Sequence, residues 1–267
     1  MIEKDFILLI PYFNNIAGLN NSIKSINYPS DLFEILLIDD GSEVELSLNK
    51  LDEFTNHLTI NIIRLNKNRG IVNALNEGLK FLKDRTDFKY IARLDCDDIC
   101  NSERFIEQVK FLNENSDIGL LGSWCRFINS ETKKSYLYRA KTEHFDILRE
   151  MHFKCSFIHP TVMFRKEILN TIGCYPNDYV HAEDYAYFWK ILKTTKGAIL
   201  DKELVIIEFS EKNISLQNYN LQIISRIKVI NEFGNLKFLK MAGIFLLRCK
   251  LLLPKKMILW LKLRYLN

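Results

Sequence analysis

The sequence predicts an α/β protein in which a sheet is covered by helices, followed by basic amphipathic helices at the C-terminal end. Three observations support this fold class. Short, unbroken apolar runs alternate with segments of helical periodicity, acidic clusters follow two of these runs directly, and the last 30 residues interleave basic with apolar side chains.

The first half of the chain alternates strand and helix. Apolar runs over residues 6–11 and 34–40 have strand length, and Leu19, Ile23 and Ile26 between them share one helix face. Further strands are expected over 58–66 and 88–95, on either side of a helix over 70–84 that begins at Gly70. This alternation predicts a parallel sheet whose ligand sites gather at the carboxyl ends of its strands.

The second half begins after a helix expected over residues 102–115. Strands are predicted over 118–128 and 160–166, followed by a short helix from Lys166 to Thr171 and a turn at Gly173. The segment 182–195 has the apolar spacing of a helix. We expect one large domain over residues 1–215 and a helical extension over 216–267.

Composition restricts the class of protein and its surroundings. Of 267 residues, 48% are hydrophobic and 26% charged, and a formal net charge of +4 does not single out nucleic acid as a partner. The six cysteines form no C-x-x-C pair, which argues against zinc and favours free thiols in a reducing compartment. The apolar run near the N-terminus is too short for a signal peptide, so we expect a cytoplasmic protein without bound nucleic acid.

The C-terminal tail from about Leu236 is basic and apolar. It carries eight lysines and arginines between Lys237 and Arg264 and no acidic residue, and its longest uncharged stretch, residues 241–247, is shorter than the roughly 20 residues of a membrane span. We therefore expect peripheral attachment to the inner face of the cytoplasmic membrane. The alternative is a pair of helices, broken by Pro254, that pack on the core.

Three aspartates are crowded at the end of the strand predicted over residues 88–95, in the stretch "YIARLDCDDICNSERF". Like charges at such spacing are costly unless a cation neutralises them, so Asp95 and Asp97 suggest a site for Mg²⁺ or Mn²⁺. Such ions use one or two carboxylates and leave other positions to phosphate oxygens, which predicts a bound diphosphate. Alternatively, Asp98 or Ser102 caps the following helix.

Two more acidic pairs have both structural and functional interpretations. Asp39 and Asp40 follow a strand and precede Gly41, as in an ordinary turn. Glu183 and Asp184 open a helix, where the helix dipole favours negative charge without any catalytic role.

Six segments together resemble the inverting, GT-A fold glycosyltransferases of family 2. They are "ILLIPYFNN", "EILLIDDGS", "NKNRGIVNALNEGL", "YIARLDCDDICNSERFIEQVKFL", "IHPTVMFRKE" and "GCYPNDYVHAEDYAYFWKIL". The resemblance covers about residues 5–215 and is strongest to bacterial members that build lipopolysaccharide, O-antigen and capsule. It implies a Rossmann-like mixed sheet flanked by helices as the catalytic domain.

The resemblance implies a UDP-sugar as the donor. In the family, positions matching Pro11, Tyr12 and Asn14 line the nucleotide pocket, and an acid matching Asp39 or Asp40 accepts a hydrogen bond from the uracil N–H. Asn66, Arg69 and Gly70 match a loop beside that pocket. Many relatives have an arginine where this chain has Leu75, so the role of that arginine is either absent here or supplied by Arg69 or Arg93, for example as a contact to phosphate.

The resemblance also implies the roles in catalysis. Asp184 matches the general base that deprotonates the acceptor hydroxyl, which then attacks the anomeric carbon opposite the diphosphate and inverts its configuration. The metal on Asp95 and Asp97 stabilises the leaving group. Asp98 is expected to support the loop or the ribose, Glu183 to support the base, and His159 either to contact the acceptor or to be a buried residue with satisfied hydrogen bonds.

One segment departs from the family pattern. Some relatives have a metal-binding histidine after the catalytic helix, where this chain has Glu208 and Ser210, which implies fewer protein ligands for the metal.

Two other functions remain as alternatives to transfer of a sugar to a glycan or lipid-linked acceptor. A nucleotidyltransferase would need basic residues in the first loop, which has none, and a non-catalytic sugar-binding protein would not need the full set of acids.

Overall fold

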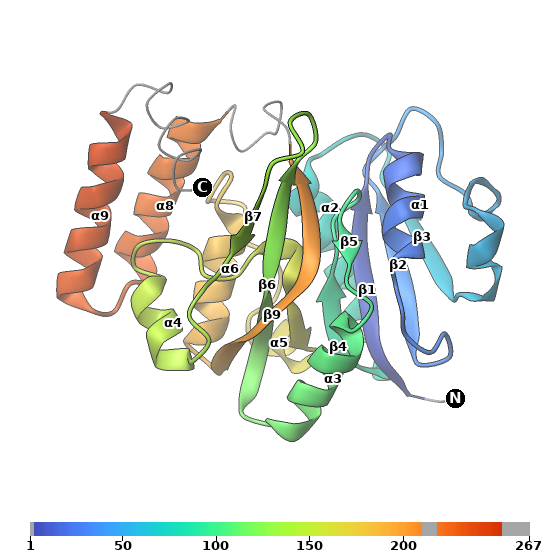
Figure 1. Ribbon diagram of the computed structural model, residues 1–267, viewed down its shortest axis with the longest axis horizontal. Helices are drawn as coiled ribbons and strands as arrows, with labels where there is room; N and C mark the ends of the chain where they lie inside the picture. The colour runs from blue at the N-terminus through green and yellow to red at the C-terminus, as the bar shows by residue number, and fades with distance from the viewer. Residues whose placement is uncertain (1–2, 210–217, 253–267) are drawn as a thin grey trace.

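The computed structural model describes residues 3–209 and 218–252 (Figure 1). The strands within these ranges form a nine-stranded mixed sheet with the order β3-β2-β1-β4-β8-β6-β9-β5, and β7 pairs with β6 outside this path. The predicted strand–helix alternation is confirmed in the first half, and the sheet continues through the second half without a break.

Four parallel strands make up the first half of the sheet. They are β1 (Lys4–Tyr12), β2 (Phe33–Asp39), β3 (Ile60–Arg64) and β4 (Phe88–Arg93). Tyr12 pairs with Asp39, and Asp39 with Arg64, so the carboxyl ends of β1, β2 and β3 are level. The helices α1 (Ile16–Lys24), α2 (Ile71–Leu82) and α3 (Arg104–Glu114) agree with the predicted ones, although α1 ends before Ile26 of its predicted apolar face and α2 ends sooner than residue 84.

The second half of the sheet reverses direction at one strand. β8 (Met163–Arg165) runs antiparallel to both β4 and β6 (Ile118–Asn129), so β6 points the same way as β4. The strand expected over 160–166 is shorter than predicted, because residues His159–Thr161 form a 3-10 turn. The short helix α5 (Glu167–Thr171) follows as expected, with Gly173 at a φ of 76°.

Four elements of the second half had no separate sequence prediction: β5 (Ile99–Cys100), β7 (Ser135–Tyr138), α4 (His144–Glu150) and β9 (Lys196–Phe209). β9 lies parallel to β6 over almost its whole length, with register shifts near Trp124. Asp201 and Lys202 in the middle of β9 are exposed, and these charged residues interrupt the apolar run by which a buried strand is recognised in the sequence.

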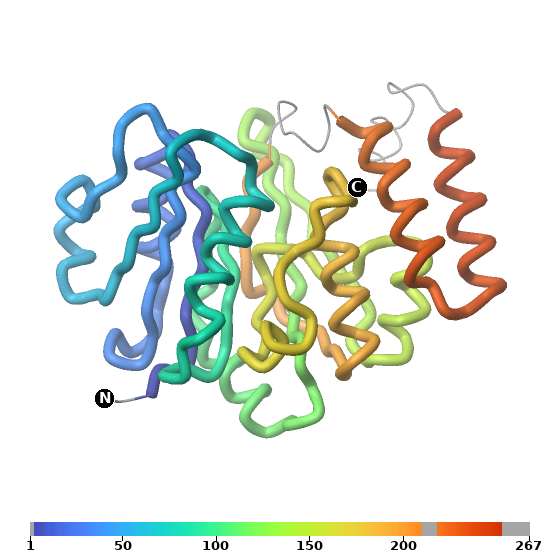
Figure 2. The backbone as a smooth tube through the Cα atoms, turned by 180° about the vertical axis from the view of Figure 1, so that it is seen from behind, coloured from blue at the N-terminus to red at the C-terminus, as the bar shows by residue number. Residues whose placement is uncertain are grey.

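Two apolar layers enclose the sheet, because alternate residues of each buried strand point to opposite faces. Ile7 and Leu9 of β1 face the layer that contains α2 and α6 (Glu183–Leu192), whereas Phe6 and Leu8 face the layer that contains α1 and α3. Viewed from behind, α2 and α6 lie over the sheet, and the two C-terminal helices extend this layer to one side (Figure 2).

The helices within the described part of the predicted extension, residues 218–252, pack on the main core. Helix α8 (Tyr219–Phe233) buries Ile223, Val229 and Ile230 in the same layer as α6, and α9 (Lys237–Leu251) packs on α8 and buries Leu247. Of the two tail helices in the core-packing alternative, the first corresponds to α9, whose inner face packs against α8. Pro254 and residues 253–267 lie outside the described residues.

Gly243 allows α9 to approach the body of the protein closely. A Cβ atom at this position would lie 1.8 Å from the carbonyl oxygen of His152, a backbone atom that has little freedom to move. We expect Gly243→Ala to push α9 away and lower the free energy of unfolding by about 1–3 kcal/mol. Thermal unfolding measures this loss, and substitution of the exposed neighbour Ala242 by Ser serves as the control. Equal melting temperatures for the two variants would contradict the close packing.

Candidate active site

The loops at the carboxyl edge of the sheet contain backbone that is costly for residues other than glycine. Asn14, Asp97 and His181 have φ values of 50°, 89° and 63°, and they follow β1, follow β4 and precede α6, respectively. Gly41 and Gly70 are also left-handed, at 70° and 86°. Strained residues concentrate where a protein holds groups in place for function, so this edge is the candidate site.

The acids that follow β2 organise the loops around them. Asp39 is fully buried, and its carboxylate accepts hydrogen bonds from the backbone N–H groups of Ser42 at 2.9 Å and Leu46 at 3.2 Å. The two oxygens of Asp40 accept from the N–H groups of Arg69 and Gly70, both at 2.8 Å. Asp39 thus fixes the loop that follows β2, and Asp40 fixes the loop that contains Asn66, Arg69 and Gly70.

The first loop differs from the expectation in its aromatic residue. Tyr12 is only 6% exposed and packs in the core, so its side chain cannot line an open pocket, whereas the adjacent Phe13 is 45% exposed. Pro11 is half-buried at the end of β1. The side chain of Asn14 accepts from the N–H of Glu43 at 2.9 Å, and this bond ties the first loop to the loop after β2.

Helix α1 holds the loop that carries the three crowded aspartates. Asn15 caps α1 through a bond from the N–H of Gly18 at 3.0 Å, and its side-chain amide also donates to Asp97 at 2.6 Å. The hydroxyl of Ser22 accepts from the N–H of Asp97 at 3.0 Å. A Cβ on Gly18 would lie 1.7 Å from a carboxylate oxygen of Asp97, so only glycine fits here without moving that side chain.

Two buried arginines lie behind the aspartates. The guanidinium of Arg93 donates to Asp95, and also to the carbonyl oxygens of Leu9 at 3.0 Å and Leu94 at 2.9 Å. Arg104 donates to the carbonyl of Arg93 at 2.6 Å. Burial tends to raise the pKa of Asp95, but the charges of nearby basic groups, Arg93 first among them, and the hydrogen bond from Arg93 together lower it. Arg93 is completely buried, which is inconsistent with the phosphate contact suggested for it.

Asp98 differs from its two neighbours in being buried. Burial and the negative charge of Asp95 raise its pKa well above the usual range. Its N–H donates to the carbonyl of Asp95 at 3.2 Å. These contacts fit support of the loop rather than contact with a ribose.

Asp95 and Asp97 are the residues here that fit a divalent cation. Each is at least partly exposed and uses one carboxylate oxygen for a hydrogen bond, to Arg93 and to Asn15, respectively. Within residues 3–209 and 218–252, no group of three or more histidine, cysteine, aspartate or glutamate side chains is arranged to hold a metal. Two carboxylates suit an ion whose remaining ligands are water and phosphate oxygens. Ser210 lies outside the described residues.

A hydrogen-bonded chain joins Asp95 to the second half of the protein. His159 Nε2 lies 2.9 Å from the hydroxyl of Tyr175 and 3.4 Å from Arg93 Nε. Burial and the charge of Arg93 lower the pKa of His159 to about 3, so it is neutral. The side chain of Asn76 fixes the backbone of Tyr175. Its oxygen accepts from the N–H of Tyr175 at 2.8 Å, and its amide group donates to the carbonyl of Tyr175 at 2.9 Å. His159 is thus bonded within the protein, and Asn76 holds two segments together.

Helix α6 begins with Glu183 and Asp184 at the same edge. Burial, and then the charge of Glu183, raise the pKa of Asp184 to about 7. The carboxylate accepts from the N–H of Tyr185 at 2.7 Å, and Glu183 Oε2 is buried without a partner among the described residues. A carboxylate with a pKa near neutrality is suited to accept and release protons.

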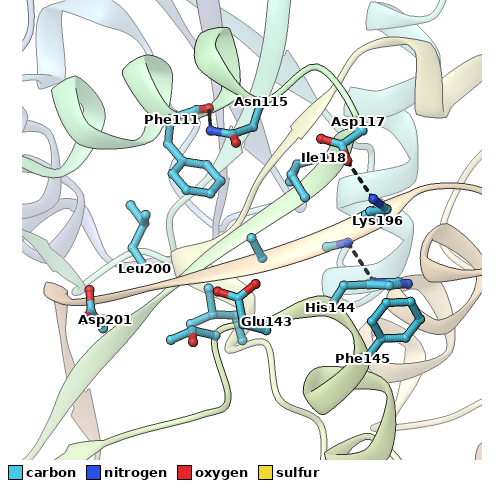
Figure 3. Close-up of a pocket in the computed structure, with 14 residues that line it drawn as sticks. Phe111, Asn115, Asp117, Ile118, Glu143, His144, Phe145, Lys196, Leu200 and Asp201 are labelled. Carbon is cyan, nitrogen blue, oxygen red and sulfur yellow. Dashed lines mark hydrogen bonds and ion pairs between the residues drawn. The ribbon is translucent and has the colours of Figure 1, made fainter.

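A separate pocket of about 520 Å³ lies at the opposite, amino end of β6 and β9 (Figure 3). Asp117 pairs with Lys196 there at 2.9 Å, and His144 Nδ1 accepts from the N–H of Gly197 at 3.2 Å. This pocket contains none of the residues that the sequence predicted for the site.

Sequence comparison relates this chain to glycosyltransferases. The model of the family described as Glycosyl transferase family 2 matches residues 7–173. A UDP-Gal:alpha-D-GlcNAc-diphosphoundecaprenol beta-1,3-galactosyltransferase of Escherichia coli is 28% identical over 75% of this chain and 71% of its own length. The amylovoran biosynthesis glycosyltransferase AmsE of Erwinia amylovora is 32% identical over 60% of this chain and 58% of its own.

A longer relative and two solved structures complete the comparison. The chain spans only 32% of the bifunctional glycosyltransferase pgtA of Dictyostelium discoideum, with 26% identity over 78% of this chain. TarS 1–349 of S. aureus has a TM-score of 0.67 at 18% identity. The match covers 90% of this chain and 69% of the TarS chain. The mannosyltransferase PcManGT of Pyrobaculum calidifontis, solved with GDP-Man and Mn²⁺, has a TM-score of 0.61 at 16% identity. The match covers 86% of this chain and 66% of the mannosyltransferase chain. These likenesses confirm the predicted fold.

The raised pKa of Asp184 predicts how stability depends on pH. The folded protein holds the proton more tightly than the unfolded chain, whose aspartate pKa is about 3.9, so the folded state loses stability as the pH rises from about 4 to about 7. Asp184→Asn removes this loss. We expect a higher melting temperature than the parent at pH 8, by about 2–4 °C for each kcal/mol gained, and a smaller difference at pH 4. A variant that melts below the parent at pH 8 would contradict the burial of a costly charge.

Proposed function

The chain belongs to glycosyl transferase family 2, and from that premise we propose that it is an inverting glycosyltransferase that moves a sugar from a UDP-sugar to a hydroxyl of a glycan or lipid-linked acceptor. The single observation that carries this proposal is that the charges of Asp95 and Asp184, from distant parts of the chain, both act on the buried Tyr175 and add to the rise in its pKa that burial causes. Hydrogen bonds connect Asp95 through Arg93 and His159 to Tyr175, and Asp184 acts on the same tyrosine through its charge.

The donor is proposed to lie over the loops that follow β1 and β2. Relatives support a uridine nucleotide, because TarS was solved with UDP-GlcNAc and the E. coli relative is named for UDP-Gal. Asp40 keeps the loop of Asn66, Arg69 and Gly70 in place, and the side chain of Arg69 is exposed beside it. An exposed guanidinium matches the oxygens of a phosphate group.

Asp184 is proposed to be the general base. Its raised pKa leaves it ionised for part of the population at neutral pH and lets it take the proton of the acceptor hydroxyl as the new bond to the anomeric carbon forms. The oxygen between that carbon and the diphosphate departs on the opposite face, so the configuration inverts. Glu183 is proposed to support the base by raising its pKa.

Asp95 and Asp97 are proposed to hold Mn²⁺ or Mg²⁺, which when bound offsets the charge that develops on the departing diphosphate. Arg93 orients Asp95, and Asn15 and Ser22 orient Asp97. The mannosyltransferase neighbour was solved with Mn²⁺, which supports a divalent ion in this fold.

The acceptor is proposed to belong to bacterial surface polysaccharide synthesis. The relatives include enzymes named for amylovoran, for O-antigen and for a diphosphoundecaprenol-linked sugar. A nucleotidyltransferase remains the runner-up. It would need cations in the loop between β1 and α1, residues 13–15, where none is present.

We also propose that the protein acts in the cytoplasm, with α9 resting on an anionic lipid surface at the inner face of the membrane. Among residues 3–209 and 218–252, no helix has the length and apolar character that a bilayer span requires. The outer side of α9 nevertheless exposes apolar side chains, with Phe238 at 88% and Phe245 at 65%, and four of the eight basic residues of the tail lie on this helix. This combination matches a negatively charged interface.

The first test is turnover of nucleotide sugars. Purified protein is screened with UDP-, GDP- and dTDP-sugars for release of the nucleotide, with Mn²⁺, with Mg²⁺ and with EDTA. We expect release from a UDP-sugar that needs the ion, and a loss of about 100-fold or more in Asp184→Asn. Asp97→Asn is expected to weaken the dependence on the ion. Asp117→Asn, in the separate pocket, is the control. Turnover equal to the parent in both site variants would contradict the assigned roles.

The second test is binding to vesicles. The parent is expected to sediment with phosphatidylglycerol-containing vesicles and less so at 0.5 M salt, because screening weakens attraction between surface charges. Replacing Phe238 and Phe245 together by Ser is expected to weaken binding roughly tenfold or more. Phe145→Ser, at a site 71% exposed on α4, is the control. Binding that is unchanged in the double variant would show that the outer face of α9 is not the contact.

A further inference from the structure

We propose that Arg226, on helix α8, is a positioning residue for the base: its guanidinium balances the charge of the Glu183–Asp184 pair and favours the ionised, proton-accepting carboxylate of Asp184. This inference rests on the proposed function for the role of Asp184. It gives the C-terminal helical region a part in the chemistry, in addition to the membrane attachment or core packing that the sequence predicted for it.

The packing of α8 brings Arg226 to the start of α6. Ile223 and Ile230, three residues before and four residues after Arg226, are buried in the layer that α6 also forms. The carbon at the centre of the guanidinium lies 5.9 Å from the ring centre of Tyr185, the residue that follows Asp184. Because residues three and four apart share one helix face, the two buried isoleucines direct Arg226 toward α6.

The loop between α4 and the 3-10 turn at His159 fixes the guanidinium. Arg226 Nη2 donates to the carbonyl of Phe153 at 3.2 Å. Two residues later, Cys155 lies near both charges, since burial and then Asp184 raise its pKa while Arg226 lowers it. The same loop therefore bonds the cation and contains a residue that lies near the acid.

Two buried polar atoms at this place have no hydrogen-bond partner among the described residues. They are Nε of Arg226 and Oε2 of Glu183. A half-buried cation and a half-buried acid that are not bonded to each other still interact through the field between them, which is stronger in a protein interior than in water. An arginine that served only to bond the backbone of Phe153 would not need to lie beside two acids.

The groups that face Asp184 come from four segments. They are Glu183 and Tyr185 on α6, Cys155 after α4, Tyr175 before α6, and Arg226 on α8. Burial and Glu183 raise the pKa of Asp184, and Arg226 opposes them. Without Arg226, the pKa rises further above about 7, so a larger fraction of Asp184 is protonated and unable to act as a base at neutral pH.

The experiment measures the ionisation of Asp184 directly. Carboxyl ¹³C NMR titration follows the aspartate side chains of the full chain, and the Asp184 signal is identified by its absence in Asp184→Asn. We expect Arg226→Met to raise the pKa of Asp184 by roughly 0.5–1 pH unit. Arg226→Lys, which keeps the charge, should move it much less. Lys228→Met removes a charge from the same helix at an exposed position and should leave it unchanged.

Enzyme kinetics give a second reading. The acid limb of kcat/KM should move upward by the same amount in Arg226→Met, so that activity falls roughly 3- to 10-fold at pH 6.5 and matches the parent at pH 9. A loss by one constant factor at every pH, or an Asp184 titration that does not move in a folded Arg226→Met variant, would overturn the inference. If the parent transfers no sugar, the proposed function fails, while the titration still decides the role of Arg226.

Discussion

The crowding of carboxylates at one edge of the sheet is the constraint on which the rest of this structure depends. Asp39, Asp40 and Asp98 are buried there, and Asp95 and Asp184 are half-buried. A buried charge is costly unless it is paired or hydrogen-bonded. The protein meets this cost in different ways. Asp39 and Asp40 accept hydrogen bonds from backbone N–H groups, and Asp95 pairs with Arg93. The pKa values of Asp98 and Asp184 are raised, which favours their neutral forms.

The solution to that constraint also fixes the loops of the site. Each carboxylate that accepts backbone N–H groups ties one loop to another, as Asp40 does for the loop ending at Gly70. Gly41 has a φ of 70°, and a Cβ there would lie 2.3 Å from the backbone of Lys67, so the loops after β2 and β3 are in contact. Such over-determined loops can hold Asn14 and Asp97 in left-handed backbone. Strain at the edge is therefore maintained by the same bonds that stabilise the charges.

The C-terminal helices are coupled to this edge through α6. His152 is buried between them, with its ring 5.2 Å from that of Trp189 on α6, and its Nε2 accepts from the N–H of Leu236 at 3.2 Å, just before α9. Burial lowers the pKa of His152, in keeping with a neutral ring that donates through Nδ1 to the carbonyl of Leu148 at 2.8 Å. One face of the α8–α9 pair thus belongs to the core, and the opposite face of α9 carries the exposed phenylalanines.

The sequence by itself determined the strands and helices of the first half, the acids at the strand ends, and the family to which the chain belongs. Those features depend on local periodicity and on short motifs such as the aspartates 95, 97 and 98, which can be read without knowing what packs against them. Only the tertiary structure decided that Tyr12 and Arg93 face the interior, that Asn76 binds Tyr175 across 99 positions, and that Arg226 lies near Asp184. Burial and long-range hydrogen bonds arise from the packing of elements far apart in the chain, and no local pattern encodes which of two faces, or which distant partner, a polar side chain will meet.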